Sequence, residues 1–527
     1  MISPDKYQRK IIDSNEKDIL VLAGAGSGKT YTLLNRMYRL VRYVTVDPEC
    51  ILVLTFTRVA CDSMRSKYIK MMDSIYDSTP DFCTFHSFCY KLICDYPAVM
   101  KKCGYSSIPS IADDTDMIRY YDKARDMSSC KLTYKKLSHP ERLKGKDLRS
   151  YELYQKALKK VLDSENVIDY DTLSETVCHL LATKDSSVDP VFSRYKYLFV
   201  DEFQDTDQYQ FKFVQAMSDC NRVLCGDALQ NIYQFRGCSN KPLKDLMNSE
   251  SWVKYELPVN YRSSKNVCDY VNGVSETFSS KDYRVVLRSK RPGPCVREFV
   301  PSSHESKYDA LAKYVSKMSN IGSVAILCRT NFEADECNSE LKKRGVDSSN
   351  NKEKDYYTDI LKAVYDEGYK NKLVQSYMTS KQYSMFRSML LQGMTFDEAL
   401  ESNLWDEDTL FMEVLQDVQV VEEVLAYEDV SYSTFILCDM FDVDKPDIEL
   451  EDSNDLVQYL LNKVQSKETP TVYVGTIHSV KGLEFNSVAV MGVNSKAFKI
   501  DNEERENLLY TALTRARNNL IVFYENK

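Results

Sequence analysis

The sequence feature that most constrains the fold is a glycine-rich segment between an apolar run and a helix-compatible stretch. Residues 18–22 predict a short strand, and a helix is compatible with the sequence that ends at about Tyr43. Glycines let the backbone curl so that its amides point at phosphate oxygens, and the helix N-terminus adds its dipole. Strand, loop and helix predict a phosphate-binding loop on an α/β fold. The loop consists of Ala23, Gly24, Ala25, Gly26, Ser27, Gly28, Lys29 and Thr30.

Within this loop, each polar residue has an expected role. Lys29 reaches the outer phosphates of a nucleotide, and Thr30 ligates Mg²⁺. The alternative is a chance glycine-rich turn before Lys29, and the flanking strand and helix argue against it. The loop therefore predicts binding and hydrolysis of ATP.

An acidic pair completes the expected nucleotide site. Residues 197–200 predict a buried strand that ends directly in Asp201 and Glu202. Such a pair lies at the carboxyl edge of a parallel sheet, where Asp201 can hold Mg²⁺ through water and Glu202 can act as general base. An apolar strand ending in Asp-Glu is common, but the continuation through residues 203–210 is much more specific.

Composition limits the class of protein. A chain of 527 residues predicts roughly three or four structural units. No apolar run approaches the roughly 20 residues needed to span a bilayer, and the N-terminus lacks an apolar signal core. We expect a soluble, intracellular protein with reduced thiols among its 16 cysteines. Core packing explains the adjacent Cys178 and His179 better than a structural zinc site does.

The chain resembles the UvrD, Rep and PcrA group of superfamily 1 DNA helicases, whose second acidic motif has the form of residues 201–206. The resemblance spans the chain from Gln8 to Arg517. Further motifs recur in the family's order at residues 55–60, 84–88, 226–237, 260–264, 328–331, 476–485 and 509–517.

The resemblance assigns the rest of the nucleotide site. Phosphoryl transfer also needs cations that reach the γ-phosphate from a second surface, and a solvated surface charge is the alternative for any single arginine. By resemblance, arginine fingers come from the second core, and other residues read adenine, sense the γ-phosphate, stack on the base and contact the ribose. The arginine fingers are Arg262 and Arg515. Gln8 reads adenine and Tyr261 stacks on the base. Gln230 senses the γ-phosphate, and Glu484 contacts the ribose.

Contacts to DNA are predicted from the same motifs. A motor that tolerates every sequence binds a strand through stacking rings and polar groups. Core packing is the alternative for an isolated ring. The net charge of −9 gives no electrostatic support for a polyanion partner, so DNA contacts must be local. The matching positions are Phe56, His86, Tyr233, Phe235, Arg236, Asn331 and His478.

The resemblance implies an α/β fold with two RecA-like P-loop cores, built on parallel sheets flanked by helices, and two mainly helical accessory insertions. We expect the first core at residues 1–95 and 191–257, with its insertion at 96–190. The second core is expected at 258–345 and 469–527, with a reduced or divergent insertion at 346–468.

Some positions depart from the family pattern. Tyr31 stands where relatives often have an adenine-contacting arginine, which puts base selectivity in question. Arg58 and Val59 replace a usual Asn-Lys, and Asn231 replaces a usual serine, so the contacts to DNA can differ.

Two charged stretches lie in the insertions. Residues 131–160 carry ten Lys or Arg against three Asp or Glu, with Lys156, Lys159 and Lys160 at helical spacing. A DNA-backbone patch and a solvated basic helix both explain this stretch. Residues 397–429 hold twelve carboxylates and no Lys or Arg. Solvated acidic helices, or a docking or autoinhibitory face, would account for it.

We predict an ATP-dependent DNA helicase or single-stranded DNA translocase, with 3′ to 5′ polarity implied by the resemblance and single/double-strand junctions as partners. DNA repair or defence is the expected setting. One alternative is the motor subunit of a helicase–nuclease or antiviral complex that unwinds little alone, with the nuclease on a separate protein. Another is an ATP- and DNA-binding scaffold without motor activity.

Overall fold

The computed structural model divides into two compact units. The first comprises Met1–Lys307, Leu327–Thr330 and Thr476–Lys527, and the second comprises Tyr308–Ile326 and Asn331–Gly475. The residues that it describes are 3–72, 78–112, 114–132, 137, 143–232, 240–348, 352–365, 370, 373, 389, 410–426, 430–441, 443, 445–446, 450, 452–466, 472–495, 498 and 502–525.

The first unit contains a six-stranded sheet in the order β3-β2-β6-β7-β1-β8, in which every neighbouring pair is parallel. Its inner strands are apolar on both faces, as expected for a sheet covered by helices on both sides. The strands are β1 (Asp18–Ala23), β2 (Ile51–Thr55), β3 (Asp81–Thr84), β6 (Tyr197–Val200), β7 (Asn221–Gly226) and β8 (Val253–Leu257).

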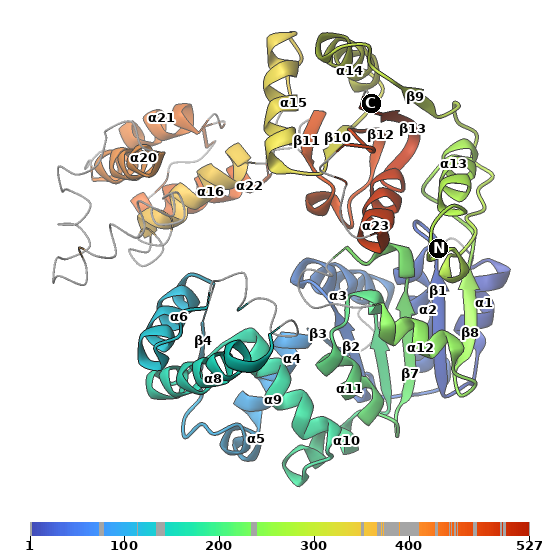
Figure 1. The fold of residues 1–527 in the computed structure, drawn as a ribbon, viewed down its shortest axis with the longest axis vertical. Coiled ribbons are helices and arrows are strands. Elements are labelled where there is room, and N and C mark those ends of the chain that lie inside the picture. Colours follow the sequence, from blue (N-terminus) through green and yellow to red (C-terminus); the bar gives the residue numbers. More distant parts are fainter. Residues whose placement is uncertain are drawn as a thin grey trace. The chain divides into compact units, whose positions relative to one another are not determined.

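Alternate residues of these strands pack into two separate hydrophobic cores, one on each face of the sheet. Ile19 and Val21 of β1 pack with one cluster, while Leu20 and Leu22 pack with the other. The first cluster lies under α1 (Lys6–Asp13), α2 (Lys29–Tyr43) and α3 (Arg58–Met72). The second lies under α4 (Phe85–Asp95), α11 (Gln208–Ala216) and α12 (Lys241–Asn248), so helices cover both faces of the sheet (Figure 1).

Between β3 and β6 the chain forms a mainly helical insertion. Its helices α6 and α8 enclose a core of their own around Ala124, Leu158 and Val161. The elements are α5 (Pro97–Lys102), β4 (Ser110–Ile111), α6 (Asp114–Ser128), α8 (Gly145–Glu165), β5 (Val167–Ile168), α9 (Tyr170–Ala182) and α10 (Asp189–Arg194).

A second sheet has the strand order β11-β10-β12-β13-β9, and the pairs β12–β13 and β13–β9 are parallel. Its strands are β9 (Arg297–Phe299), β10 (Val324–Cys328), β11 (Val472–Thr476), β12 (Phe485–Val490) and β13 (Ala516–Phe523). The helices of the first unit in this part of the chain are α13 (Lys265–Ser275) and α23 (Asn502–Leu513).

The second unit is mostly helical outside its strands. Its helices α16, α20, α21 and α22 share a core that includes Leu361, Val418, Leu437 and Leu460. The helices are α14 (His304–Ser319), α15 (Asn331–Lys343), α16 (Lys352–Tyr365), α20 (Leu410–Leu425), α21 (Val430–Met440) and α22 (Ser453–Ser466). Much of the acidic stretch 397–429, including Trp405, lies outside the described residues.

Short 3₁₀ helices are present as well, and two predicted site residues, Gln230 and His478, lie on them. They are η1 (Pro48–Cys50), η3 (Ser186–Val188), η4 (Phe203–Asp205), η5 (Ala228–Gln230), η7 (Lys281–Tyr283) and η8 (His478–Val480).

The structure confirms the predicted α/β class with parallel sheets flanked by helices. The strand predicted at residues 18–22 is β1, the helix predicted to end at about Tyr43 is α2, and the strand before Asp201 is β6. Every cysteine in the described part of the chain is a free thiol. None of the described helices has the length and apolar content that crossing a membrane requires.

Candidate active site

The phosphate loop begins where β1 ends and leads into α2. Gly26 and Gly28 adopt φ values of 67° and 78°, in the left-handed region that favours glycine. Gly28 is the N-cap residue of α2, and no side chain caps this helix end. The buried Ser27 hydroxyl has no hydrogen-bond partner in the described part of the chain. A hydroxyl buried without a partner in a glycine-rich loop at a helix N-terminus fits a phosphate-binding site.

A segment from later in the chain packs directly on this loop. The Asn260 side-chain amide donates to the Ala25 carbonyl at 2.7 Å, and the Tyr261 backbone amide donates to the Gly26 carbonyl at 2.9 Å. A Cβ atom on Gly26 would lie 2.6 Å from the Cβ of Arg262. The close approach of these two backbones therefore requires glycine at position 26.

The predicted catalytic lysine and carboxylates meet beside the loop. Lys29 Nζ lies 3.0 Å from Glu202 Oε2, and the Thr30 hydroxyl donates to Asp201 Oδ2 at 3.5 Å. Glu202 has a φ of 52°, a left-handed conformation that costs energy for any residue other than glycine. The fold therefore holds a strained residue at the position predicted for the general base.

The surroundings of Asp201 and Glu202 shift the pKa values of the two carboxylates in opposite directions. Burial and the neighbouring Glu202 raise the pKa of Asp201 to about 6. Burial would also raise the pKa of Glu202, but Lys29, Lys481 and a hydrogen bond from Gln204 outweigh it and lower that pKa to about 2. Burial would lower the pKa of Lys29, yet the charges of Glu202, Asp227 and Asp201 raise it above its ordinary value. Glu202 is thus ionised at neutral pH, as a general base must be.

A chain of hydrogen bonds leads from Glu202 to Gln230. The Gln204 side chain donates to Glu202 Oε2 at 2.7 Å and accepts from the Asp227 backbone amide at 3.0 Å. Gln230 in turn donates to Asp227 Oδ2 at 2.7 Å. Gln204, Asp227 and Gln230 are all buried, so the arrangement is rigidly supported.

Both predicted arginine fingers lie at this site. Arg515, only 1% exposed, donates to Gln230 Oε1 at 3.1 Å. Burial, with the charge of Arg262, lowers the pKa of Arg515 to about 9, so it stays cationic at neutral pH. Arg262 Nε donates to Glu484 Oε2 at 2.5 Å, and Arg517 lies 3.7 Å from the other oxygen of Glu484.

The residues predicted to contact the base are adjacent to one another. Gln8 donates to the Ser27 carbonyl at 3.4 Å and accepts from the Asp5 backbone amide at 3.1 Å. The Tyr261 hydroxyl donates to Asp5 Oδ2 at 2.6 Å, and a Cβ atom on Gly28 would lie 3.9 Å from the Tyr261 ring. Burial and the Asp5 hydrogen bond raise the pKa of Tyr261, with a smaller effect of Tyr31.

Two residues to which the sequence assigned no role also reach the site. The buried Tyr510 hydroxyl lies 3.5 Å from the Ala25 amide and 3.3 Å from Asp227 Oδ2. Lys481 Nζ lies 2.5 Å from Asp205 Oδ2 and donates to the Gln230 carbonyl at 3.1 Å. Both residues stand inside recognised motifs, which was the available signal, but their partners are hundreds of positions away.

The structure describes four of the seven predicted DNA-contacting residues. Phe56 and His86 follow β2 and β3, which pair through Thr55 and Thr84, so they lie at one edge of the first sheet. The His86 ring contacts Tyr170, with centroids 5.2 Å apart. His478 begins η8 in the first unit, whereas Asn331 begins α15 in the second. The remaining three, Tyr233, Phe235 and Arg236, lie outside the described residues.

Comparisons with known proteins agree with this geometry. Residues 5–250 match the UvrD/REP helicase N-terminal domain, and residues 471–523 match the UvrD-like helicase C-terminal domain. A probable DNA helicase II homolog of Mycoplasma pneumoniae is 24% identical, covering 98% of this chain and 83% of that protein. The ATP-dependent DNA helicase PcrA of Staphylococcus epidermidis is 23% identical, covering 98% of this chain and 82% of that protein.

A third relative is the ATP-dependent DNA helicase Rep of Buchnera aphidicola, which is 27% identical, covering 62% of this chain and 52% of that protein. The two matched domain models together cover more than half of the chain, and they include the phosphate loop, Glu202 and Arg515. The chain therefore belongs to the UvrD/Rep family of helicases.

Proposed function

We propose that this protein hydrolyses ATP to move along single-stranded DNA in the 3′ to 5′ direction and to separate duplex strands at junctions. The observation that carries the proposal is the contact between Arg515 and Gln230. Through Asp227 and Gln204, this contact connects an arginine of the C-terminal motif to the carboxylate Glu202. Residues from both ends of the chain thus share one catalytic site.

The site residues fit a magnesium nucleotide. Lys29 and the α2 N-terminus would bind the phosphates, and Thr30 with Asp201 would hold Mg²⁺, which needs only one or two carboxylates beside the phosphates. The ion would neutralise charge on the phosphates. Glu202, kept ionised by Lys29 and Lys481, would accept the proton of the attacking water. Arg262 and Arg515 would stabilise the charge of the transferring phosphoryl group.

ATP binding would draw the two arginines toward the phosphate loop, and hydrolysis would release them. We propose the first RecA-like core at residues 1–95 and 191–257 and the second at 258–345 and 469–527, with insertions at 96–190 and 346–468. A strand would pass over Phe56 and His86 on the first core and His478 on the second, together with Asn331, Tyr233, Phe235 and Arg236. Alternating contact with the two cores would give net movement.

The names of the relatives support DNA as the polymer, because DNA helicase II, Rep and PcrA are named as DNA helicases. The proposed polarity rests on the likeness of residues 201–206 to the family's second acidic motif. Because ATP and DNA are the proposed substrates, we place the activity inside the cell.

The test combines ATP hydrolysis with strand separation. Wild type should hydrolyse ATP faster when single-stranded DNA is added, and should unwind a 3′-tailed duplex in preference to a 5′-tailed one. Lys29→Ala, which removes the phosphate-binding cation, should lose both activities. ATPase activity that ignores DNA would refute the motor, while preference for the 5′ tail would refute only the polarity. Stimulated ATPase without unwinding would indicate a translocase that needs a partner.

A further inference from the structure

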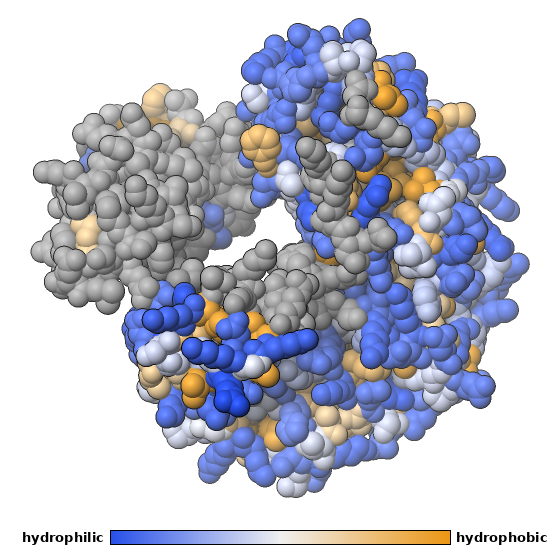
Figure 2. Space-filling model, viewed as in Figure 1, coloured by the Kyte–Doolittle hydropathy of each residue, from blue (hydrophilic) through white to orange (hydrophobic). Residues whose placement is uncertain are grey.

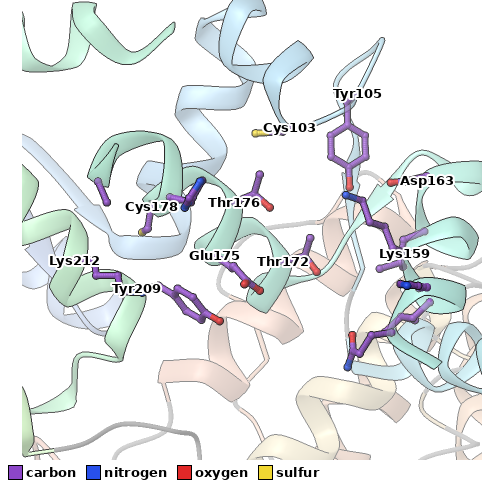
Figure 3. Close-up of a pocket in the computed structure, with 16 residues that line it drawn as sticks. Cys103, Tyr105, Lys159, Asp163, Thr172, Glu175, Thr176, Cys178, Tyr209 and Lys212 are labelled. Carbon is purple, nitrogen blue, oxygen red and sulfur yellow. The ribbon is translucent and has the colours of Figure 1, made fainter. Parts of the chain in front are cut away.

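A surface hollow in the insertion of the first unit is separate from the active site described above. It lies where α8, α9 and α11 meet the chain after α5, and its volume is about 640 Å³ (Figure 3). Pockets of roughly 300–1,000 Å³ are the usual size for small-molecule ligands. The hollow is therefore large enough for a nucleotide.

The floor of the hollow is apolar. Leu158 and Leu162 of α8, Cys178 of α9 and Cys103 are all buried and line it, and Tyr105 adds its ring. The Tyr105 hydroxyl donates to the Val167 carbonyl at 3.2 Å, which turns its polar end into the protein. A flat, apolar part of a ligand can therefore pack on this floor without leaving a polar group of the protein unsatisfied.

The rim carries cationic side chains from two directions. Lys156 and Lys159 reach it from α8 and Lys212 from α11, and all three are exposed. Within the described part of the chain, neither Lys156 nor Lys159 forms an ion pair. Lys212 Nζ lies 5.7 Å from the centroid of the Tyr209 ring, which also lines the hollow. Three ammonium groups around one hollow favour a ligand that carries a phosphate.

Carboxylates and hydroxyls face the same space. Figure 3 shows Glu175, Thr172 and Tyr209 on one side and Lys159, Asp163 and Tyr105 on the other, with open space between them. Burial and a hydrogen bond with Glu175 raise the pKa of Tyr209 to about 12, so its hydroxyl stays protonated. Ionised carboxylates accept hydrogen bonds only, and exocyclic amino groups of bases are suitable donors.

We propose that this hollow binds one nucleoside phosphate unit whose base carries an exocyclic amino group. The phosphate lies at Lys156, Lys159 and Lys212, the base packs on the apolar floor, and its amino group donates to Asp163 or Glu175. The unit comes from an unpaired DNA strand or from a free nucleotide, because the same chemistry recognises both. This site is additional to the ATP site and does not depend on strand movement.

Part of the basic run on α8 lies outside the hollow. Lys160 is exposed next to Lys159 but does not line it, and exposed Arg149 and Leu153 also lie elsewhere on the helix. Figure 2 shows hydrophilic side chains with hydrophobic ones between them over this part of the insertion. If α8 is only a solvated basic helix, Lys159 and Lys160 should contribute equally to DNA binding. If the hollow is a binding site, Lys159 should contribute more than Lys160.

The first test compares Lys159→Ala with Lys160→Ala, which remove the same charge one position apart. The probes are fluorescent single-stranded oligodeoxycytidylate and oligodeoxythymidylate, measured on the full chain at low salt. We expect Lys159→Ala to weaken oligodeoxycytidylate binding about fivefold and Lys160→Ala less than about twofold, as for loss of one exposed ionic contact. Wild type should bind oligodeoxycytidylate more tightly, and Asp163→Ala with Glu175→Ala should reduce that preference. Unfolding curves report whether each variant folds.

The second test locates the base and its source. An oligonucleotide with one photoreactive cytosine should crosslink to the peptide that contains Tyr209, and Thr176→Trp, which fills the hollow, should abolish this crosslink. Competition by deoxycytidine monophosphate would identify a free nucleotide as a ligand, and crosslinking that resists it would identify the strand. Both results support the site.

Equal effects of Lys159→Ala and Lys160→Ala, with crosslinks only outside the hollow, would overturn the proposal. So would an acidic peptide that binds the hollow while deoxycytidine monophosphate and oligodeoxycytidylate do not. None of these readouts uses ATP turnover. The proposed nucleotide site can therefore be refuted while the proposed motor activity is confirmed. Conversely, ATPase activity that does not respond to DNA would refute the motor activity without affecting the crosslink result.

Discussion

Lys481 and Asp205 form an ion pair with a distance of 2.5 Å between Nζ and Oδ2, although 276 positions separate them. The Asp205 side chain is 1% exposed and that of Lys481 is 12% exposed. Lys481 also donates to the Gln230 carbonyl and lowers the pKa of Glu202. The Lys481 side chain therefore acts on two residues. It keeps Glu202, the proposed general base, ionised, and it holds Gln230, the residue proposed to sense the γ-phosphate.

Lys481→Met should destabilise the protein by about 3 kcal/mol, because it removes the ammonium group that forms an ion pair with the buried Asp205 carboxylate. The midpoint of chemical denaturation measures this loss. Adding Asp205→Asn should restore most of the stability, since the carboxylate charge that had lost its ammonium partner is then removed as well. If the double variant is as unstable as Lys481→Met, the ion pair is not the cause.

Glu202→Gln should keep ATP binding and lower the rate of hydrolysis by about 10²- to 10⁴-fold, because an amide cannot accept the proton of the attacking water. Single-turnover hydrolysis measures the rate, and a fluorescent ATP analogue measures binding. A rate within a few-fold of wild type would assign the general base to another residue.

The pH dependence of ATP hydrolysis should follow Asp201 on its acid side. Burial and the neighbouring Glu202 raise the pKa of Asp201 from its ordinary 3.8 to about 6. In the proposed site Asp201 holds Mg²⁺ in its ionised form, so kcat/KM should fall below about pH 6. Glu202, with its pKa of about 2, remains ionised throughout this range. Removing the charge of Glu202 in Glu202→Gln should move the midpoint of Mg²⁺–ATP binding to lower pH. An unchanged midpoint would exclude coupling between the two carboxylates.

Stability should show the opposite signs for the two groups. The folded pKa of Glu202 lies below its ordinary 4.5, so its stabilising contribution is present above pH 4.5 and is lost as pH falls toward 2. The folded pKa of Asp201 is raised, so its contribution is present below pH 3.8 and is lost as pH rises through about 6. Denaturation of Asp201→Asn against wild type should show the variant gaining relative stability between pH 4 and pH 7.

Arg515→Lys should reduce kcat by about 10³-fold or more, because lysine cannot reproduce the guanidinium contacts of the residue that we propose stabilises the transition state. Arg517→Lys is the matched control, since Arg517 is 48% exposed and contacts Glu484 only at 3.7 Å. Its kcat should stay within a few-fold of wild type. Equal losses in the two variants would argue against a specific role for Arg515.

Gly26→Ala should impair folding or nucleotide binding more than Gly104→Ala, although both glycines have positive φ values, 67° and 93°. Each substitution costs about 1–2 kcal/mol for the left-handed backbone. Only at Gly26 would the new Cβ also meet Arg262, whereas nothing lies within 4 Å at Gly104. Thermal unfolding and ATP affinity measure the difference, and equal effects would show that the close approach to Arg262 is unimportant.

Local sequence patterns were sufficient to predict the strands and the loop that hold the candidate site residues. The apolar run before Ala23 and the one before Asp201 became β1 and β6, because short buried strands and glycine-rich turns depend on adjacent residues. The order of motifs along the chain likewise indicated the family. Asp201, Glu202 and Lys29 could therefore be named before their distances were known.

Contacts between distant segments were decided only by the tertiary structure. The sequence contains Lys481, Tyr510 and Gln204, but no local pattern states that Lys481 pairs with Asp205 or that Tyr510 reaches Asp227. The left-handed backbone of Glu202 is also invisible in the sequence, since glutamate rarely adopts it.

The basic run on α8 shows the same division. Its charge and helical spacing could be read from Lys156, Lys159 and Lys160, and both interpretations of that stretch agreed with them. Packing of α9 and α11 beside α8 places Lys156 and Lys159 on the rim of a hollow and leaves Lys160 off it. A sequence determines which residues a helix carries, whereas the neighbours that the fold brings to each face decide what those residues can bind.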